Sequence, residues 1–298
     1  MRMTAATIYR DSAASIERTS EQMLEFQRQV ASGKRITRPS DDPQGTATAI
    51  GERAGIAAVE QYTRTSDSVT SRLTVMDTTL SDMIDRLSQA QVAVVSAQGS
   101  TKTAGQREVA AQMLEGIREA LLADLNTSFR GAYLFAGADS TDPPFVADVN
   151  GTVGPYQGSV REVAVDIDEN RAVTIGFDGS AIAQGSAATD VFAVLDAASA
   201  AARAADGAGL QQALTDLAAV FDRITYSQMR VGTTLAAIDA QQPQLTDRRL
   251  AGAARVARVE NANLAEAITA MKQAEAAYSA ALGATGRITQ LSLMDYLK

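Results

Sequence analysis

Residues 59–94 read VEQYTRTSDSVTSRLTVMDTTLSDMIDRLSQAQVAV, the most regular stretch of this 298-residue chain. Apolar or small residues recur in it at alternating spacings of three and four. Such a repeat buries one face of a helix in left-handed, coiled-coil-like packing, so we expect a long helix here. The repeat positions are Val59, Tyr62, Ser66, Val69, Leu73, Met76, Leu80, Met83, Leu87, Ala90 and Val94.

A second repeat of this kind predicts another long helix near the end of the chain. Pro243 should kink it, because proline lacks the amide that an inner helical turn uses. The pattern resumes in a shifted register from Leu264, which predicts that the terminal helix has different neighbours. The positions before the shift are Leu210, Leu214, Leu217, Phe221, Ile224, Gln228, Val231, Leu235, Ile238, Gln242 and Leu245.

Heptads also mark the N-terminal segment, which we expect to be helical. Gly33 can cap the end of this helix, and Pro39 prevents its continuation. Asp42 followed by Pro43 predicts the start of the next helix, with an acceptor at the cap and proline in the first turn. The seam residues are Tyr9, Ile16, Met23, Phe26 and Val30.

The periodicity changes in the middle of the chain. Apolar residues alternate with polar ones over 163–167 and again over 173–177, on either side of the polar turn 168–170. This pattern predicts a β-hairpin. Asp190 can cap a return to helix, and Gly207 can close that helix.

The sequence therefore predicts a mainly α fold: a long antiparallel, coiled-coil-like helical rod built from N- and C-terminal segments, with a small β-rich insertion at its far tip. The expected divisions are 1–42, an N-terminal helix and turn of an inner terminal domain; 43–136, half of the rod; 137–189, the outward insertion; 190–245, the other half of the rod; and 246–298, the C-terminal helix of the inner domain.

Composition argues against several classes of function. The net charge of −8 and the absence of a basic stripe disfavour nucleic-acid binding. The chain has neither His nor Cys, which leaves no Cys/His metal site and few groups for catalysis. We expect no catalytic, cofactor-binding or metal-binding residues, and no segment is apolar enough to predict a membrane span.

Two short motifs invite a chemical interpretation. The stretch 166–170 begins like a calcium loop, but Arg171 replaces the required glycine and Phe177 the closing glutamate. Asn126 and Asn150 each begin a glycosylation pattern, which is short enough to occur by chance. We assign neither motif a function.

Two blocks near the chain ends resemble the flagellin family of bacterial flagellar proteins. The first is the turn after the N-terminal helix, and the second is Glu260 to Ala267. Three middle motifs, 131–137, 143–145 and 156–158, and the ending 290–297 resemble the hook-associated members of the family more than the filament-forming ones. The family residues of the turn are Ser32, Gly33, Arg35, Pro39, Asp41, Asp42 and Pro43.

The resemblance implies a secreted, non-enzymatic subunit that joins hook to filament as an adapter ring. It implies export through the flagellar type III system with a chaperone bound near the C-terminus. It also implies terminal helices that become ordered against copies of the same chain, a neighbouring hook-associated protein and flagellin. The expected interface residues are Tyr9, Ile16, Met23, Phe26, Val30, Leu264, Ile268, Met271, Tyr278 and Leu282.

Two alternatives stay open at this stage. A filament flagellin would share the terminal blocks. A secreted coiled-coil adhesin or type III translocator would explain the heptads without the motifs. Copy number in purified flagella separates these possibilities, because a filament subunit dominates such a preparation, a junction subunit is a trace component and a translocator is missing.

Overall fold

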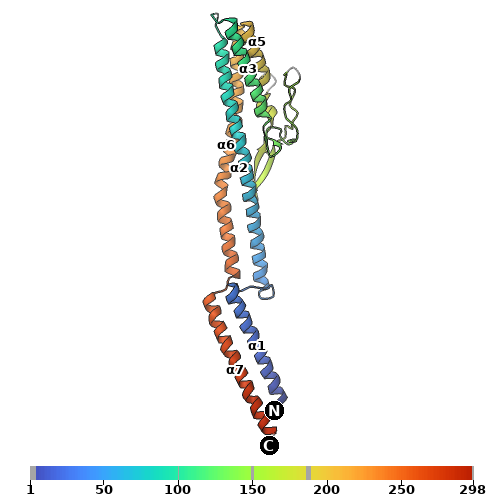
Figure 1. The fold of residues 1–298 in the computed structure, drawn as a ribbon, viewed down its shortest axis with the longest axis vertical. Helices are drawn as coiled ribbons and strands as arrows, with labels where there is room; N and C mark the ends of the chain where they lie inside the picture. Colours follow the sequence, from blue (N-terminus) through green and yellow to red (C-terminus); the bar gives the residue numbers. More distant parts are fainter. Residues whose placement is uncertain (1–4, 100, 149–150, 186–188, 297–298) are drawn as a thin grey trace. The chain divides into compact units, whose positions relative to one another are not determined.

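The computed structural model describes residues 5–99, 101–148, 151–185 and 189–296. The chain forms two compact units. Unit 1 comprises Met1–Ala58 and Asp247–Lys298, and unit 2 comprises Val59–Thr246. Helices α2 (Pro43–Ala97) and α6 (Gly207–Glu260) contribute to both (Figure 1).

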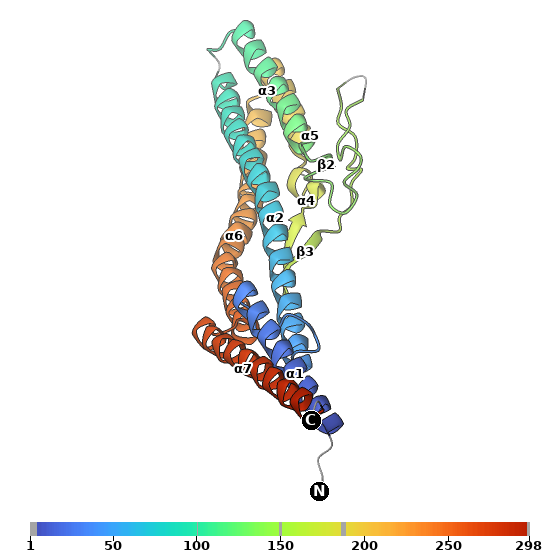
Figure 2. The ribbon, with the colours of Figure 1, turned by 60° about the horizontal axis from the view of Figure 1, so that its bottom comes forward.

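Helices dominate unit 2 (Figure 2). Parts of α2 and α6 lie side by side with α3 (Ala104–Leu125) and α5 (Val191–Ala204). The predicted repeat of α2 is confirmed, because every seam residue from Ser66 to Val94 is buried, while Val59 and Tyr62 are half-buried. On α6, Leu217, Ile224, Val231 and Ile238 are fully buried in the same core.

The mainly α fold with a small β segment is thus confirmed, and most predicted helix boundaries hold. Gly33 follows α1 (Ala5–Ser32) with φ of 69°, a conformation that glycine adopts without strain. The carboxylate of Asp42 accepts the amide of Gly45 at 2.8 Å at the start of α2. Asp190 caps α5 through the amides of Phe192 and Ala193.

One boundary differs from the prediction. Helix α5 ends at Ala204, and Ala205, with φ of 57°, is its left-handed cap; Gly207 instead begins α6. As predicted, the chain has one long helix that contains Pro243 and a separate terminal helix: α6 continues to Glu260, and α7 (Leu264–Tyr296) begins where the pattern resumes. An exposed proline removes a single hydrogen bond from a long helix, whereas residues 261–263 are non-helical and the amide of Ala262 donates instead to the carbonyl of Gly33.

The predicted hairpin is present as β3 (Val163–Asp168) paired antiparallel with β4 (Arg171–Gly176). A second, shorter hairpin pairs β1 (Ser128–Phe129) with β2 (Ala132–Tyr133), and α4 (Gly179–Ala183) follows β4. The sequence pattern does not predict β1, β2 or α4, because each is too short to show a period.

Within unit 2, the β segment lies along the helices and not at their tip, which corrects the expected placement (Figure 1). Arg72 of α2 donates to the carbonyls of Ile175 and Tyr133 at 2.8 and 3.2 Å. The side chains of Ile167 and Phe177 belong to the helical core. Because the segment supplies apolar residues to that core, it packs against the sides of the helices.

The three middle motifs meet in one buried cluster. Leu134, Phe135 and Ala136 are fully buried, and the hydroxyl of Tyr156 donates to the carbonyl of Phe135 at 3.0 Å. The ring of Phe145 lies 5.3 Å from that of Tyr156, centroid to centroid. Burial raises the pKa of Tyr156 to about 12. Their shared role in the core explains why these motifs occur together.

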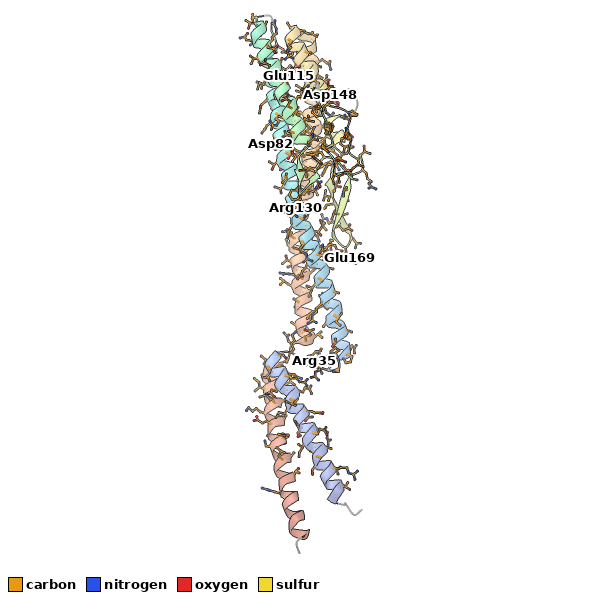
Figure 3. The ribbon with its side chains drawn as sticks, turned by 45° about the vertical axis from the view of Figure 1, so that its right-hand side comes forward. Arg35, Asp82, Glu115, Arg130, Asp148 and Glu169 are labelled. Carbon is orange, nitrogen blue, oxygen red and sulfur yellow. The ribbon has the colours of Figure 1, made fainter. Side chains whose placement is uncertain are left out.

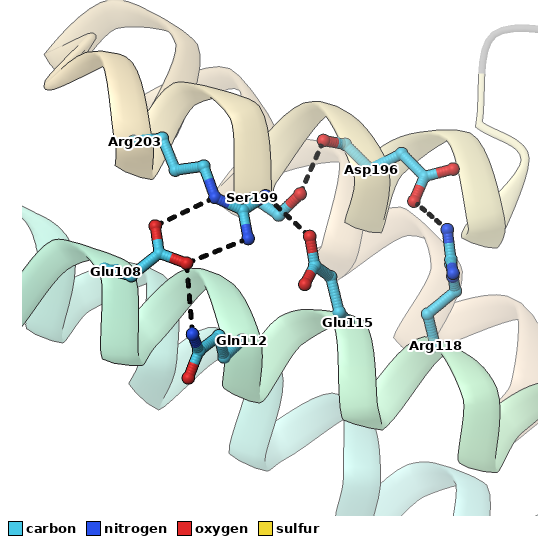
Figure 4. A network of polar contacts seen from close by, with 7 residues as sticks. All are labelled: Glu108, Gln112, Glu115, Arg118, Asp196, Ser199 and Arg203. Carbon is cyan, nitrogen blue, oxygen red and sulfur yellow. Dashed lines mark hydrogen bonds and ion pairs between the residues drawn. The ribbon is translucent and has the colours of Figure 1, made fainter. Parts of the chain in front are cut away.

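Polar contacts fasten α3 to α5 on the surface of unit 2 (Figure 4). The guanidinium of Arg203 pairs with Glu108 at 3.0 Å and with Glu115 at 2.6 Å, and Arg118 pairs with Asp196 at 2.6 Å. The hydrogen bonds from Arg203 lower the pKa of both glutamates.

Candidate functional site

The terminal helices α1 and α7 pack against each other in unit 1, running in opposite directions (Figures 1 and 2). Four of the predicted seam residues of α1, namely Ile16, Met23, Phe26 and Val30, are half-buried. On α7, Met271 and Tyr278 are half-buried as well. The side chain of Tyr9 lies outside the described residues.

Three of the predicted interface residues of α7 remain exposed. Leu264 is 48% exposed, Ile268 45% and Leu282 46%. They form a ridge on α7 that α1 does not cover. Exposed apolar side chains of this size at regular helical spacing are typical of an interaction surface.

The residues of α7 that pack most closely within the subunit are not among those predicted from the sequence. Ala267 and Ala274 are only 5% and 7% exposed. Both are small, so an apolar-stripe search that favours large side chains passes over them. The signal was their spacing of seven residues, which places both alanines on one face of α7.

The two terminal family blocks, far apart in sequence, meet through backbone hydrogen bonds. The amide of Arg35 donates to the carbonyl of Glu260 at 2.7 Å, and the amide of Ala262 donates to that of Gly33 at 2.9 Å. Lys34 and Asn261 form an isolated antiparallel bridge. We call residues 33–36 with 260–262 the crossing.

Charged side chains surround the crossing. The carboxylate of Glu260, a buried residue, accepts Arg53 at 2.7 Å and Lys34 at 3.4 Å. Arg35, labelled in Figure 3, donates to the carbonyl of Val259 and to the carboxylate of Asp42, each at 3.0 Å. These contacts tie the end of α1 and the start of α2 to the end of α6.

The remaining family residues shape the turn. Asp41 accepts the amides of Arg38 and Thr37, and these bonds lower the pKa of its carboxyl. The amide of Gly45 and the guanidinium of Arg35 likewise lower the pKa of Asp42. The hydroxyl of Ser32 donates to the carbonyl of Arg28, Pro39 is exposed, and Pro43 begins α2.

The described residues contain no cluster of acidic, His or Cys side chains that could hold a metal ion. None of their helices has the length and apolar character needed to cross a membrane. The amide side chain of Asn126 is engaged with the backbone of Phe145 in both directions, at 2.8 and 3.1 Å, which argues against its glycosylation. Asn150 lies outside the described residues.

Comparison with known proteins identifies relatives across most of the chain. Residues 6–140 match the family described as bacterial flagellin N-terminal helical region. Flagellar hook-associated protein 3 of Escherichia coli K12 is 29% identical over 214 residues, 67% of this chain and 66% of the relative. The protein of that name from Salmonella typhimurium LT2 is 28% identical over 183 residues, 61% of this chain and 56% of the relative.

The matches therefore span somewhat less than two thirds of each relative's length. Solved structures have a similar fold. A flagellar hook-associated protein from Vibrio parahaemolyticus superimposes with a TM-score of 0.69 at 15% identity, over 74% of this chain and 100% of that one. The flagellar junction protein FlgL from Legionella pneumophila gives 0.61 at 12% identity, over 72% and 100%.

Proposed function

This chain belongs to the flagellin family, and on that premise we propose that it is a structural subunit of the bacterial flagellum that joins hook to filament as an adapter ring. The observation that carries the proposal is the uncovered ridge of Leu264, Ile268 and Leu282 on α7. A family of subunits that polymerise needs a surface that the single subunit leaves open. The ridge supplies one, and it begins at Leu264 within the second family block.

The contacts within the terminal pair support assembly-dependent ordering. Among its described side chains, none on α1 is buried, and only Ala267 and Ala274 are buried on α7. Helices of this kind gain little free energy from pairing alone in water. The remaining burial would come from other subunits, with Ile16, Met23, Phe26, Val30, Met271 and Tyr278 at the edges of the surface.

The expected partners of the subunit are those that the family resemblance implies. These are copies of the chain itself, a neighbouring hook-associated protein and flagellin. Export would use the flagellar type III system, with a chaperone bound near the C-terminus. The subunit would then be secreted and would reside at the hook-filament junction.

Copy number and phenotype test this function together. Purified flagella should contain the chain as a trace component at one end of the filament, and cells that lack it should release flagellin monomer into the medium. Abundance equal to the main filament protein would assign the chain to the filament instead. Absence from flagella would favour an adhesin or translocator.

A single substitution tests the ridge. Ile268→Asp would bury a carboxylate at each subunit interface, at a cost of about several kcal/mol per copy. Assembly should fail while the subunit is still exported. Val95→Asp is the matched control, because Val95 is an exposed apolar residue of unit 2 at 55%. Normal filaments on cells carrying Ile268→Asp would exclude the ridge as the joint.

A further inference from the structure

The outer face of α1, turned away from α7, forms a groove with the family turn. Its lining is Glu21, Leu24, Glu25, Gln27, Arg28, Ala31 and Arg38. Leu24 is 50% exposed within this groove. An exposed leucine flanked by charged residues of both signs suits a partner helix that carries an apolar residue beside opposite charges.

The face of α7 that carries the ridge has such a set. Ile268 is followed four residues later by Lys272 and seven later by Glu275, all on one helical face. The side chains of Lys272 and Glu275 are 70% and 57% exposed and lie 3.5 Å apart, so they can exchange partners at little cost.

The charges on the two helices are complementary when the residues of one helix are taken forwards and those of the other backwards. Along α1 the order is Arg18, Glu21, Leu24; backwards along α7 it is Glu275, Lys272, Ile268. Antiparallel docking therefore pairs Arg18 with Glu275 and Glu21 with Lys272, and places Leu24 beside Ile268. Both ion pairs have opposite charges, and the spacing of three residues between them is the same on both helices.

The alignment of α1 with α7 inside one subunit agrees with this docking. Phe26 shares a pocket with Ala267. Because α1 and α7 are antiparallel, Glu21, five residues before Phe26, lies level with Lys272, five residues after Ala267. Arg18 and Glu275 are likewise level, at eight residues each. A second copy displaced sideways, without a shift along the helices, presents its ridge to the groove with these pairs aligned.

We infer that the groove on α1 of one subunit receives the ridge of α7 from a second copy of this chain, in antiparallel register. This inference rests on the proposed function and names the partner of the same surface. Each copy offers one groove and one ridge, so the interface is head-to-tail. Such an interface closes into a ring when the rotation between copies closes.

Engineered cysteines test the pairing directly, because the natural chain has none. Two forms of the chain, distinguished by tags of different length, are expressed together. One form carries Leu24→Cys and the other Ile268→Cys. Flagella are then purified and oxidised. We expect a mixed disulfide dimer in assembled flagella and none in free subunits. Replacing Ile268→Cys by Val95→Cys is the control and should give no dimer.

Other cross-links would overturn the inference. Like-with-like dimers only, or no dimer in flagella that contain both chains, would contradict the head-to-tail pairing. A thiol-to-amine cross-linker at position 24 that captures a different flagellar protein would assign the groove to that partner. In each case the chain is present in flagella, so the proposed function survives; absence of both chains from flagella would instead contradict the proposed function.

Charge exchange gives a second test. Glu21→Lys places two cations together, and Lys272→Glu places two anions together, so each variant alone should reduce incorporation into flagella. The double variant restores opposite charges at every interface and should recover incorporation. Equal loss in the double variant would contradict the proposed ion pair.

Discussion

The two helical seams of this chain differ in what fills them. In unit 2, Leu73, Leu80 and Leu87 of α2 are fully buried and face a core shared with α6. In the terminal pair of unit 1, the buried positions among the described side chains are Ala267 and Ala274. Burial contributes about 25 cal/mol per Å² of apolar surface, so large side chains stabilise unit 2 far more.

A heptad pattern alone therefore does not show whether its apolar residues pack within the subunit or against another one. Unit 2 covers its apolar stripes by itself. The terminal pair covers one face with small residues and leaves Leu264, Ile268, Leu282 and Leu24 exposed. A seam that is complete within the subunit stabilises the fold, whereas one that is incomplete is available for assembly.

The largest expected difference in stability is between two variants, each with an aspartate placed in one of the two seams. Leu217→Asp should destabilise the free subunit by on the order of 5 kcal/mol, because it removes a fully buried side chain and buries a carboxylate. Ile268→Asp should change the stability of the free subunit by less than about 0.5 kcal/mol, since its side chain already meets water. Urea unfolding of both variants measures the contrast, and equal losses would contradict it.

A smaller effect concerns the attachment of the β segment in unit 2. The guanidinium of Arg223 donates to the carbonyls of Ile182, Ala183 and Thr189, each at 2.8 Å. Arg223→Met should cost about 1–3 kcal/mol, because buried carbonyls lose their donors. Arg230→Met is the control, since Arg230 pairs with the more exposed Glu162. Thermal unfolding that ranks the two in reverse would exclude this anchoring role.

In unit 1, the crossing should respond to the loss of a single charge. Glu260→Gln keeps the shape of the side chain but weakens its contacts with Arg53 and Lys34, at a cost of about 1 kcal/mol. The amides of Arg35 and Ala262 should then exchange faster with solvent, while those of unit 2 should not change. Glu52→Gln, which removes a more exposed ion pair with Arg255, is the control. Unaltered exchange at both amides would show that Glu260 does not hold the crossing.

The last effect is absent at neutral pH, appears only in alkali and concerns unit 2. The folded-state pKa of Tyr156 is about 12, above the ordinary value of 10, so the folded state retains a proton that the unfolded chain releases. The resulting stabilisation is complete below pH 10 and is lost as the pH rises towards 12. Tyr156→Phe should flatten this part of the pH profile of unfolding. A profile of unchanged slope in the variant would assign the loss to another group.

Much of the fold followed from local pattern. The seam of α2, the hairpin β3–β4 and the caps at Asp42 and Asp190 depend on periodicity or on one residue beside a helix end, which a sequence displays directly. The exact end of α6 did not follow, because its apolar repeat stops at Leu245 whereas the helix continues to Glu260.

The candidate site was less accessible from sequence. The residues of the terminal stripes were found, but the division of α7 into a covered face and an exposed ridge was not. The two blocks around Gly33 and Glu260 were recognised separately, yet their pairing joins residues more than 200 positions apart. Local pattern carries no record of such a contact, and only the fold brings the backbones together.

Amide exchange in the free and assembled protein shows whether other subunits complete the terminal seam. In the free subunit, exchange should be fast over Tyr9 to Val30 and over Leu264 to Leu282, and slow over Val69 to Val94, because only the last seam is complete. Assembly into flagella should slow exchange at both ends and leave the core of unit 2 unchanged. Equal protection of all three segments in the free subunit would contradict the claim that other copies complete the terminal seam.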